Sequence, residues 1–143
     1  MRRTAALAAT ALALAAACLW PDENISSRYP GVIQDANGLL PISLPDTVRA
    51  AQSFNVRITT EGGGCARADS GETVVSGRLA LVTPFDVDPS RSDKSTVCPA
   101  IVKFMPRDVS LRLDSLGVTT VRVMGTRAAD GEIVTVDRDV VAR

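Results

Sequence analysis

The sequence predicts an all-β fold, a β-sandwich of about seven to nine strands, with a small β-barrel as the alternative. Short runs of alternating apolar and polar residues recur along the chain, as expected of strands that bury one face. Turn-forming residues separate these runs about every 8–12 residues, a spacing typical of sandwiches and barrels. No stretch combines a helical period with capping residues. Because periodicity does not show whether a sheet closes on itself, the barrel remains the alternative.

The expected strands follow one another from Val32 to the end of the chain. Val32-Ile33 and Ile42-Ser43-Leu44 flank the Asn37-Gly38 pair, which is a strong turn signal. Residues 54–60 alternate cleanly, so their apolar members are expected to face the core. A further turn is expected at Asp130-Gly131. Later strands are expected at residues 73–75, 79–82, 101–105, 109–113, 119–123, 133–136 and 140–141.

Two stretches resemble bacterial immunoglobulin-like domains. Leu44-Pro45-Asp46-Thr47-Val48 followed by Phe54-Asn55-Val56-Arg57-Ile58 is similar to their opening, where a proline-led strand reaches a turn and enters a Phe-x-Val-x-Val strand. Residues 113–123 are similar to their late strands, where a Gly turn precedes alternating valines. The resemblance implies an immunoglobulin-like β-sandwich over residues 32–143. It has two departures: Ala51-Gln52 stands where these domains usually have a Gly turn, and no Trp lies between the later cysteines, which puts the standard inter-sheet disulfide in doubt.

The N-terminal segment predicts export. Residues 1–17 have a basic start and a short apolar run that ends in small residues, as in secretory signal peptides. The run is shorter than the roughly 20 apolar residues that a membrane span requires. Ala15-Ala16-Ala17-Cys18 resembles the lipobox of bacterial lipoproteins, which implies that Cys18 receives lipid on its sulfur and becomes the new N-terminus. Cleavage after Ala17 by ordinary signal peptidase, which leaves a soluble secreted protein, is the alternative.

The cysteine count favours the lipidated form. The chain has three cysteines, and an exported protein with an odd cysteine carries a loose thiol in an oxidising compartment. Lipid on Cys18 leaves Cys65 and Cys98 to pair in a disulfide that closes about 33 residues. We expect a structural bond, because redox pairs usually occur as Cys-x-x-Cys at the start of a helix. The glycines before Cys65 give its backbone freedom to reach bonding geometry.

Residues 18–31 are expected to form the lipidated cysteine and a tether, since they mix proline, serine, asparagine and charge without periodicity. Leu19 is not the Asp that resembles an inner-membrane retention signal, which favours the outer membrane where there is one. The order from Pro30-Gly31-Val32-Ile33 to the final Val140-Val141-Ala142-Arg143 is similar to small uncharacterised bacterial envelope lipoproteins. This resemblance implies a location and a fold, but no activity.

Composition excludes several functions. The chain has no histidine, which removes Ser-His-Asp and Cys-His catalysis and every zinc site that needs histidine. Without the leader it has 14 basic against 16 acidic residues and no basic run, so we expect no nucleic-acid partner. One Trp, one Tyr and three Phe offer few faces for stacking sugars or bases. We expect no cofactor.

Two groups of residues are candidate sites. Asp86, Asp88, Ser90 and Asp93 place oxygen ligands at alternate positions, as calcium loops do, although Arg91 stands where a calcium hand has Gly. Carboxylates held a few ångströms apart can hydrolyse glycosides, but the sequence does not pair the late ones. Ser-Lys chemistry has no motif behind it. The late carboxylates are Asp108, Asp114, Asp130, Glu132, Asp137 and Asp139.

These observations predict a non-catalytic, lipid-anchored cell-envelope protein that serves as a structural or protein-interaction module. Its expected contacts are the membrane, through lipid on Cys18, and an envelope or extracellular protein. One alternative is an inhibitor of secreted proteases that presents residues 86–97 as a disulfide-supported loop. A less favoured alternative is a small envelope hydrolase that uses carboxylates or a Ser-Lys pair.

Overall fold

The chain folds as eleven strands and one short 3-10 helix in a computed structural model that describes residues 27–143. The all-β prediction is confirmed. The described residues hold more strands than the seven to nine expected, and three of them have only two residues. The elements are β1 (Arg28–Pro30), β2 (Val32–Asp35), β3 (Gly38–Leu39), β4 (Ile42–Ser43), β5 (Thr47–Val48), β6 (Ser53–Gly63), β7 (Arg67–Ser76), β8 (Leu79–Val87), η1 (Pro89–Arg91), β9 (Val102–Arg112), β10 (Gly117–Arg127) and β11 (Ile133–Ala142).

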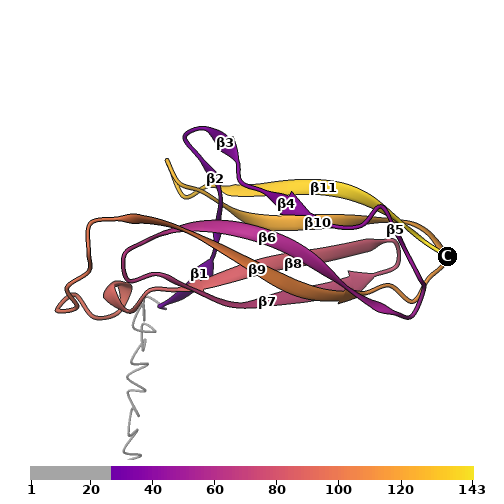
Figure 1. Cartoon of the computed structure of the whole chain (residues 1–143), viewed down its shortest axis with the longest axis horizontal. Helices are drawn as coiled ribbons and strands as arrows, with labels where there is room; N and C mark the ends of the chain where they lie inside the picture. The colour runs from indigo at the N-terminus through magenta and orange to yellow at the C-terminus, as the bar shows by residue number, and fades with distance from the viewer. Residues whose placement is uncertain (1–26) are drawn as a thin grey trace, which may run out of the picture.

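The strands form two layers that are joined through β2 (Figure 1). In one layer β6 and β9 run antiparallel, paired from Ser53 with Arg112 to Gly63 with Val102, and β4 pairs with β6. The other layer contains β7, β8, β10 and β11, with β5 beside the end of β11. β2 pairs with β6 on one side and β10 on the other, so the sheet is continuous but not closed. The architecture is sandwich-like.

The hydrophobic core lies between the two layers. The alternation expected for residues 54–60 is confirmed, because Val56 and Ile58 of β6 are fully buried and Phe54 packs against the core from its edge. Removing such branched side chains from water is the main favourable term in folding. The other buried apolar side chains of the core come from β2, β8, β9, β10 and β11 and the residues beside them: Ile33, Ala80, Val82, Val109, Leu111, Leu113, Val121, Val123, Val136, Val140 and Ala142.

The domain begins earlier than the sequence predicted. Residues 28–31 were expected in the tether, but β1 pairs antiparallel with β8, and Gly31 follows it into β2. Gly31 is needed there because an added Cβ would lie 2.5 Å from Thr60 Cγ2 and 2.8 Å from Asp86 Oδ2. Residues 28–31 therefore belong to the domain, whereas Cys18 and the signal peptide lie outside the described residues.

Two turns have features that the sequence pattern did not predict. The Asn37-Gly38 turn is present, with Gly38 at φ 125°, but it joins β2 to β3, and the strand at Ile42 pairs with β6 instead. Ala51 takes a left-handed φ of 61°, a backbone angle that favours Gly. Its N–H donates to the carbonyl of Leu113 at 2.8 Å, which fixes this turn against the end of the β9 segment.

The expected disulfide joins Cys65, in the β6–β7 turn, to Cys98, in the loop between η1 and β9, with an S–S distance of 2.06 Å. It joins the β6–β7 connection to the connection from β8 to β9, each of which runs from one layer to the other. The neighbouring glycines do not take left-handed backbone angles. Gly64 is required for close packing, because an added Cβ would lie 2.2 Å from the carbonyl oxygen of Pro99.

Replacing both cysteines of this bond with serine should lower the free energy of unfolding by about 3–4 kcal/mol, because the reduced chain gains loop entropy when it unfolds. Urea unfolding of the wild type and of the Cys65→Ser/Cys98→Ser variant measures the difference. Thiol titration of the denatured, unreduced domain is the control. Two reactive thiols at Cys65 and Cys98 would contradict the bond.

Candidate functional site

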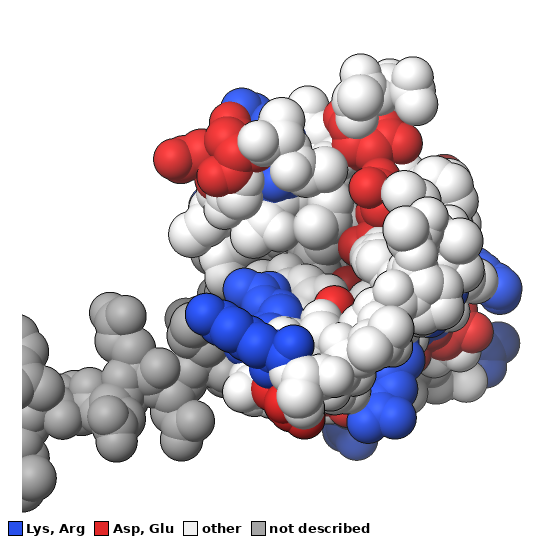
Figure 2. Space-filling view, turned by 90° about the vertical axis from the view of Figure 1, so that its left-hand side faces the viewer, with Lys and Arg blue, Asp and Glu red and all other residues white. Residues whose placement is uncertain are grey.

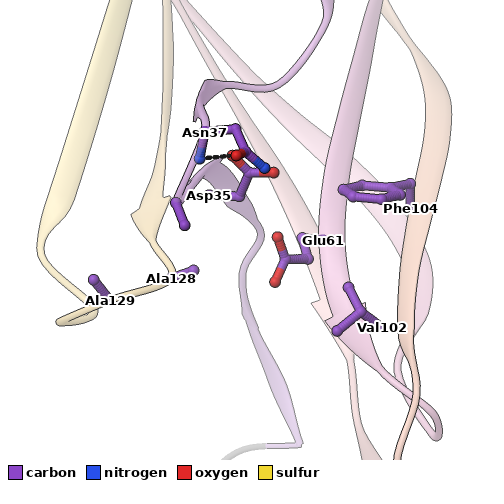
Figure 3. Close-up of a pocket in the computed structure, with 8 residues that line it drawn as sticks. Asp35, Asn37, Glu61, Val102, Phe104, Ala128 and Ala129 are labelled. Atoms are coloured by element: carbon purple, nitrogen blue, oxygen red, sulfur yellow. Dashed lines mark hydrogen bonds between the residues drawn. The ribbon is translucent and has the colours of Figure 1, made fainter.

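The end of the sandwich where the described chain begins carries an open groove of about 360 Å³ (Figure 3). Four segments form its walls: the β2–β3 turn, β6, β9 and the β10–β11 turn. Its lining is mainly apolar, with two carboxylates. The lining residues are Asp35, Ala36, Asn37, Glu61, Val102, Phe104, Ala128 and Ala129.

The β6–β9 register places the groove's largest side chains next to each other. Glu61 of β6 is the register partner of Phe104 of β9, so both stand on the outer face of this layer. Val102 lies two residues along on the same face, opposite Gly63, which has no side chain to cover it. Phe104 is 57 % and Val102 65 % exposed. The outer face therefore presents apolar surface beside a carboxylate.

The groove has an acidic character. Asp35 and Glu61 line it, and no Lys or Arg is among its lining residues. Within residues 27–143 neither carboxylate forms an ion pair; Asp35 Oδ1 accepts a hydrogen bond from the Asn37 N–H at 2.7 Å (Figure 3). Figure 2 shows this end of the molecule, where acidic atoms line a hollow in the upper half of the face. The groove therefore suits a cationic group that comes with apolar surface.

A buried ion pair lies between the layers, on the opposite face of β6 and β9 from Glu61 and Phe104. The side chain of Asp86 in β8 is fully buried, and that of Arg107 in β9 is 7 % exposed. Arg107 donates hydrogen bonds to Asp86 Oδ1, to Thr60 Oγ1 and to the Phe85 carbonyl. Thr60 Oγ1 in turn donates to Asp86 Oδ1 at 3.1 Å. Among the described residues, Asp86 Oδ2 and Arg107 Nε have no hydrogen-bond partner.

Burial raises the pKa of Asp86 above its ordinary value, and the hydrogen bond and charge of Arg107 offset part of this rise. Burial also raises the pKa of the neighbouring Tyr29, with smaller contributions from Asp86 and Asp88. These shifts follow from packing inside the sandwich. Asp86 and Arg107 are closed off from the groove surface, so they act on it only through the strands that they hold.

The candidate calcium ligands are not brought together. Asp86 points into the core toward Arg107, whereas Asp88 Oδ1 accepts hydrogen bonds from Ser90 N and Oγ at 2.9 and 2.6 Å and caps η1. Asp93 makes equivalent bonds to Ser95. No group of three His, Cys, Asp or Glu side chains within residues 27–143 is placed to hold a metal ion. The acidic residues of this segment have structural roles.

The late carboxylates mostly pair with arginines instead of with one another. Exposed ion pairs join Asp114 to Arg112, Asp130 to Arg127 and Asp137 to Arg122 at 2.7–2.9 Å, and Asp108 lies 3.9 Å from Arg57. Asp139 accepts from Thr120 Oγ1 at 2.8 Å, and Asp130 accepts from the N–H of Glu132. No hydrogen bond in the described part of the chain joins a serine to a lysine. Neither hydrolase arrangement is assembled.

Sequence reasoning missed both the groove and the buried ion pair. The groove depends on pairing Glu61 with Phe104 across 43 positions of sequence, which no local pattern reveals. The sequence does contain a pattern that indicates the ion pair. Asp86 has the same parity in its strand as buried Ala80 and Val82, and Arg107 has the same parity as buried Val109. Opposite charges at inward positions of two strands indicate a buried pair.

The chain matches no protein-family model, no curated protein and no solved structure in comparisons with each. Within residues 27–143, no helix has the length and apolar character needed to cross a membrane.

The buried ion pair predicts a specific pH dependence of stability. Because the folded-state pKa of Asp86 is raised, its contribution to stability is complete below its unfolded pKa of about 3.9 and is lost as the pH rises through the folded value. The pKa values of Asp69, Asp93 and Asp137 are lowered instead, so their contributions change only below about pH 4. Urea unfolding should show that the free energy of unfolding of the wild type falls between pH 4 and pH 8. Asp86→Asn should abolish this fall.

The matched variant Arg107→Met leaves the Asp86 carboxylate buried without its partner. It should lower the free energy of unfolding at pH 7 by about 3–5 kcal/mol and extend the decline to higher pH. If the free energy of unfolding changes equally with pH in the wild type and in Asp86→Asn above pH 4, the raised pKa of buried Asp86 is contradicted.

Proposed function

We propose that this protein is a non-catalytic, lipid-anchored envelope protein whose domain binds another protein through the groove. The observation that carries the proposal is the groove itself, in which exposed Val102 and Phe104 lie beside carboxylates that have no basic partner in the described chain. A sandwich-like fold alone does not indicate an activity, because such folds serve many functions.

The groove has the properties of a protein-binding surface. Aromatic side chains are enriched in interfaces, where they contribute a large contact area. Phe104 stands on a long strand that is paired along its whole length, and the Asp35 turn is held by its own hydrogen bond. Binding to a surface already ordered loses little conformational entropy. The carboxylates favour a partner segment that presents a Lys or Arg next to an apolar side chain.

The proposed anchor is the lipid on Cys18. Cys65 and Cys98 bond to each other, which leaves Cys18 as the remaining cysteine of the chain. Residues 19–27 span at most about 30 Å when fully extended, at 3.3–3.6 Å per residue. The segments that line the groove lie at the end of the domain where the described chain begins (Figure 1). The proposed partner is therefore an envelope or extracellular protein that reaches close to the membrane, the outer membrane where there is one.

The two alternative functions gain no specific support. A protease-inhibiting loop presents extended backbone to the protease, whereas residues 89–91 form η1, and Asp88 and Asp93 fasten the flanking backbone. A hydrolase needs carboxylates that face each other or an activated serine. Asp137 in β11 pairs with Arg122 in β10, whereas Asp114 and Asp130, which lie in turns, pair with the nearby Arg112 and Arg127.

Capture of the tagged full chain from its native envelope, after cross-linking, tests the groove. A partner should be recovered with the wild type. The amount recovered should fall at least about tenfold with Glu61→Lys/Phe104→Ala, equivalent to a loss of about 1.4 kcal/mol in binding free energy. The control is Asp114→Lys/Leu116→Ala, which changes an acidic and an exposed apolar residue near the β9–β10 turn. Equal recovery with the groove variant, or no partner at all, would contradict the proposal.

A further inference from the structure

We propose that the loop between η1 and β9 is a second contact surface, which lies against anionic lipid when the protein is anchored. This apolar–basic loop is defined by exposed Val97 and Ile101 and by Lys94 between η1 and β9, together with the flanking Arg91 at the end of η1 and Lys103 at the start of β9. The inference rests on the proposed lipid anchor. It concerns a different part of the end face from the groove and a different kind of partner.

Two apolar side chains of the loop are exposed. Val97 is 92 % exposed, and Ile101, four residues later, is 54 % exposed. Single apolar residues on a protein surface are ordinary, and their exposure alone does not identify an interface. Two further observations, the place where the chain enters the domain and the charge of the loop, indicate what covers these residues.

The loop lies where the described chain begins. The N–H of Asp88, at the start of the segment, donates to the carbonyl oxygen of Ser27 at 2.8 Å. Lipid on Cys18 places the membrane within about 30 Å of this point, the fully extended length of the intervening residues. η1 and the loop after it occupy the same end of the sandwich in Figure 1. The anchor therefore brings this loop close to the lipid surface.

The charge of the loop matches an anionic membrane. Arg91, Lys94 and Lys103 supply three cations against the two carboxylates of Asp88 and Asp93, which accept hydrogen bonds from backbone N–H groups within the segment, so the segment carries a small excess of positive charge. Most basic atoms of the end face lie in its lower half in Figure 2, and most acidic atoms lie in the upper half. Basic residues near anionic lipid headgroups are attracted to them, and apolar neighbours enter the interface.

The fold holds the loop in place before any contact. The disulfide fixes Cys98 next to Val97, and the Cys65 Sγ atom lies 3.9 Å from the Val97 carbonyl oxygen. On the other side, Asp88 caps η1, and the Arg91 guanidinium lies 4.0 Å from the centroid of the Tyr29 ring. Because the loop is already ordered, its contact with lipid loses little conformational entropy.

A single tryptophan reporter tests the inference in the lipidated full chain. Trp20→Phe removes the only tryptophan, and Val97→Trp then places one in the loop. In vesicles of phosphatidylethanolamine and phosphatidylglycerol, its emission should shift to shorter wavelength and be quenched by lipids with brominated chains. The matched control is Leu116→Trp in the same background, because Leu116 is 65 % exposed in the turn between β9 and β10. Its emission should not change.

Changing the charge of the loop tests whether attraction to anionic lipid headgroups contributes to the contact. Lys94→Glu/Lys103→Glu, or vesicles of neutral phosphatidylcholine, should weaken the shift and the quenching of the loop tryptophan in the Val97→Trp variant. Vesicle flotation, with Cys18→Ser as the unanchored control, reports the anchor separately. A protein that floats while its loop tryptophan emits as in water would overturn the loop contact and leave the anchor intact.

Failure of the unsubstituted lipoprotein to float would overturn the anchor, and the loop proposal with it. A shift in native envelope fragments that is absent from protein-free vesicles would assign the loop to a protein partner and overturn the lipid contact.

Discussion

The buried pair of Asp86 and Arg107 is the constraint on which the end of the domain that carries the groove depends. It joins β8 to β9, and Thr60 brings β6 into the same hydrogen-bonded cluster. Gly31 packs directly on it and carries the chain from β1 into β2. An unpaired charge at such a position is strongly destabilising, whereas apolar replacement of a whole pair is often tolerated. We therefore assign the pair the role of fixing strand positions, which need not increase net stability.

The ion pair also fixes the positions of surface residues that lie close to it on the same strands. Glu61 follows Thr60 in β6, so the cluster that holds Thr60 also holds one wall of the groove. Phe104 lies three residues before Arg107 in β9 and faces Glu61 through the ladder. The Cys65–Cys98 bond closes the same end beyond these residues. The groove and the apolar–basic loop are thus presented by one ordered frame.

Local sequence patterns predicted the parts of this frame that are themselves local. Alternation identified the strand from Phe54 to Thr60 and its buried side chains, and the cysteine count identified the Cys65–Cys98 pair. The pattern missed β1, whose three residues do not alternate and whose strand character comes from pairing with β8. It also missed the groove, because the meeting of Glu61 and Phe104 is fixed by a long-range register. Short-range periodicity contains no information on such registers.

The proposed anchor is lipid on Cys18, which holds this end of the domain at a membrane. Intact-mass spectrometry of the protein extracted from its native membrane tests it most directly. We expect a chain that begins at Cys18, carries a diacylglyceryl group there, and lacks two hydrogens because of the disulfide. An unmodified chain that begins at Cys18, or a chain that retains the leader, would contradict it.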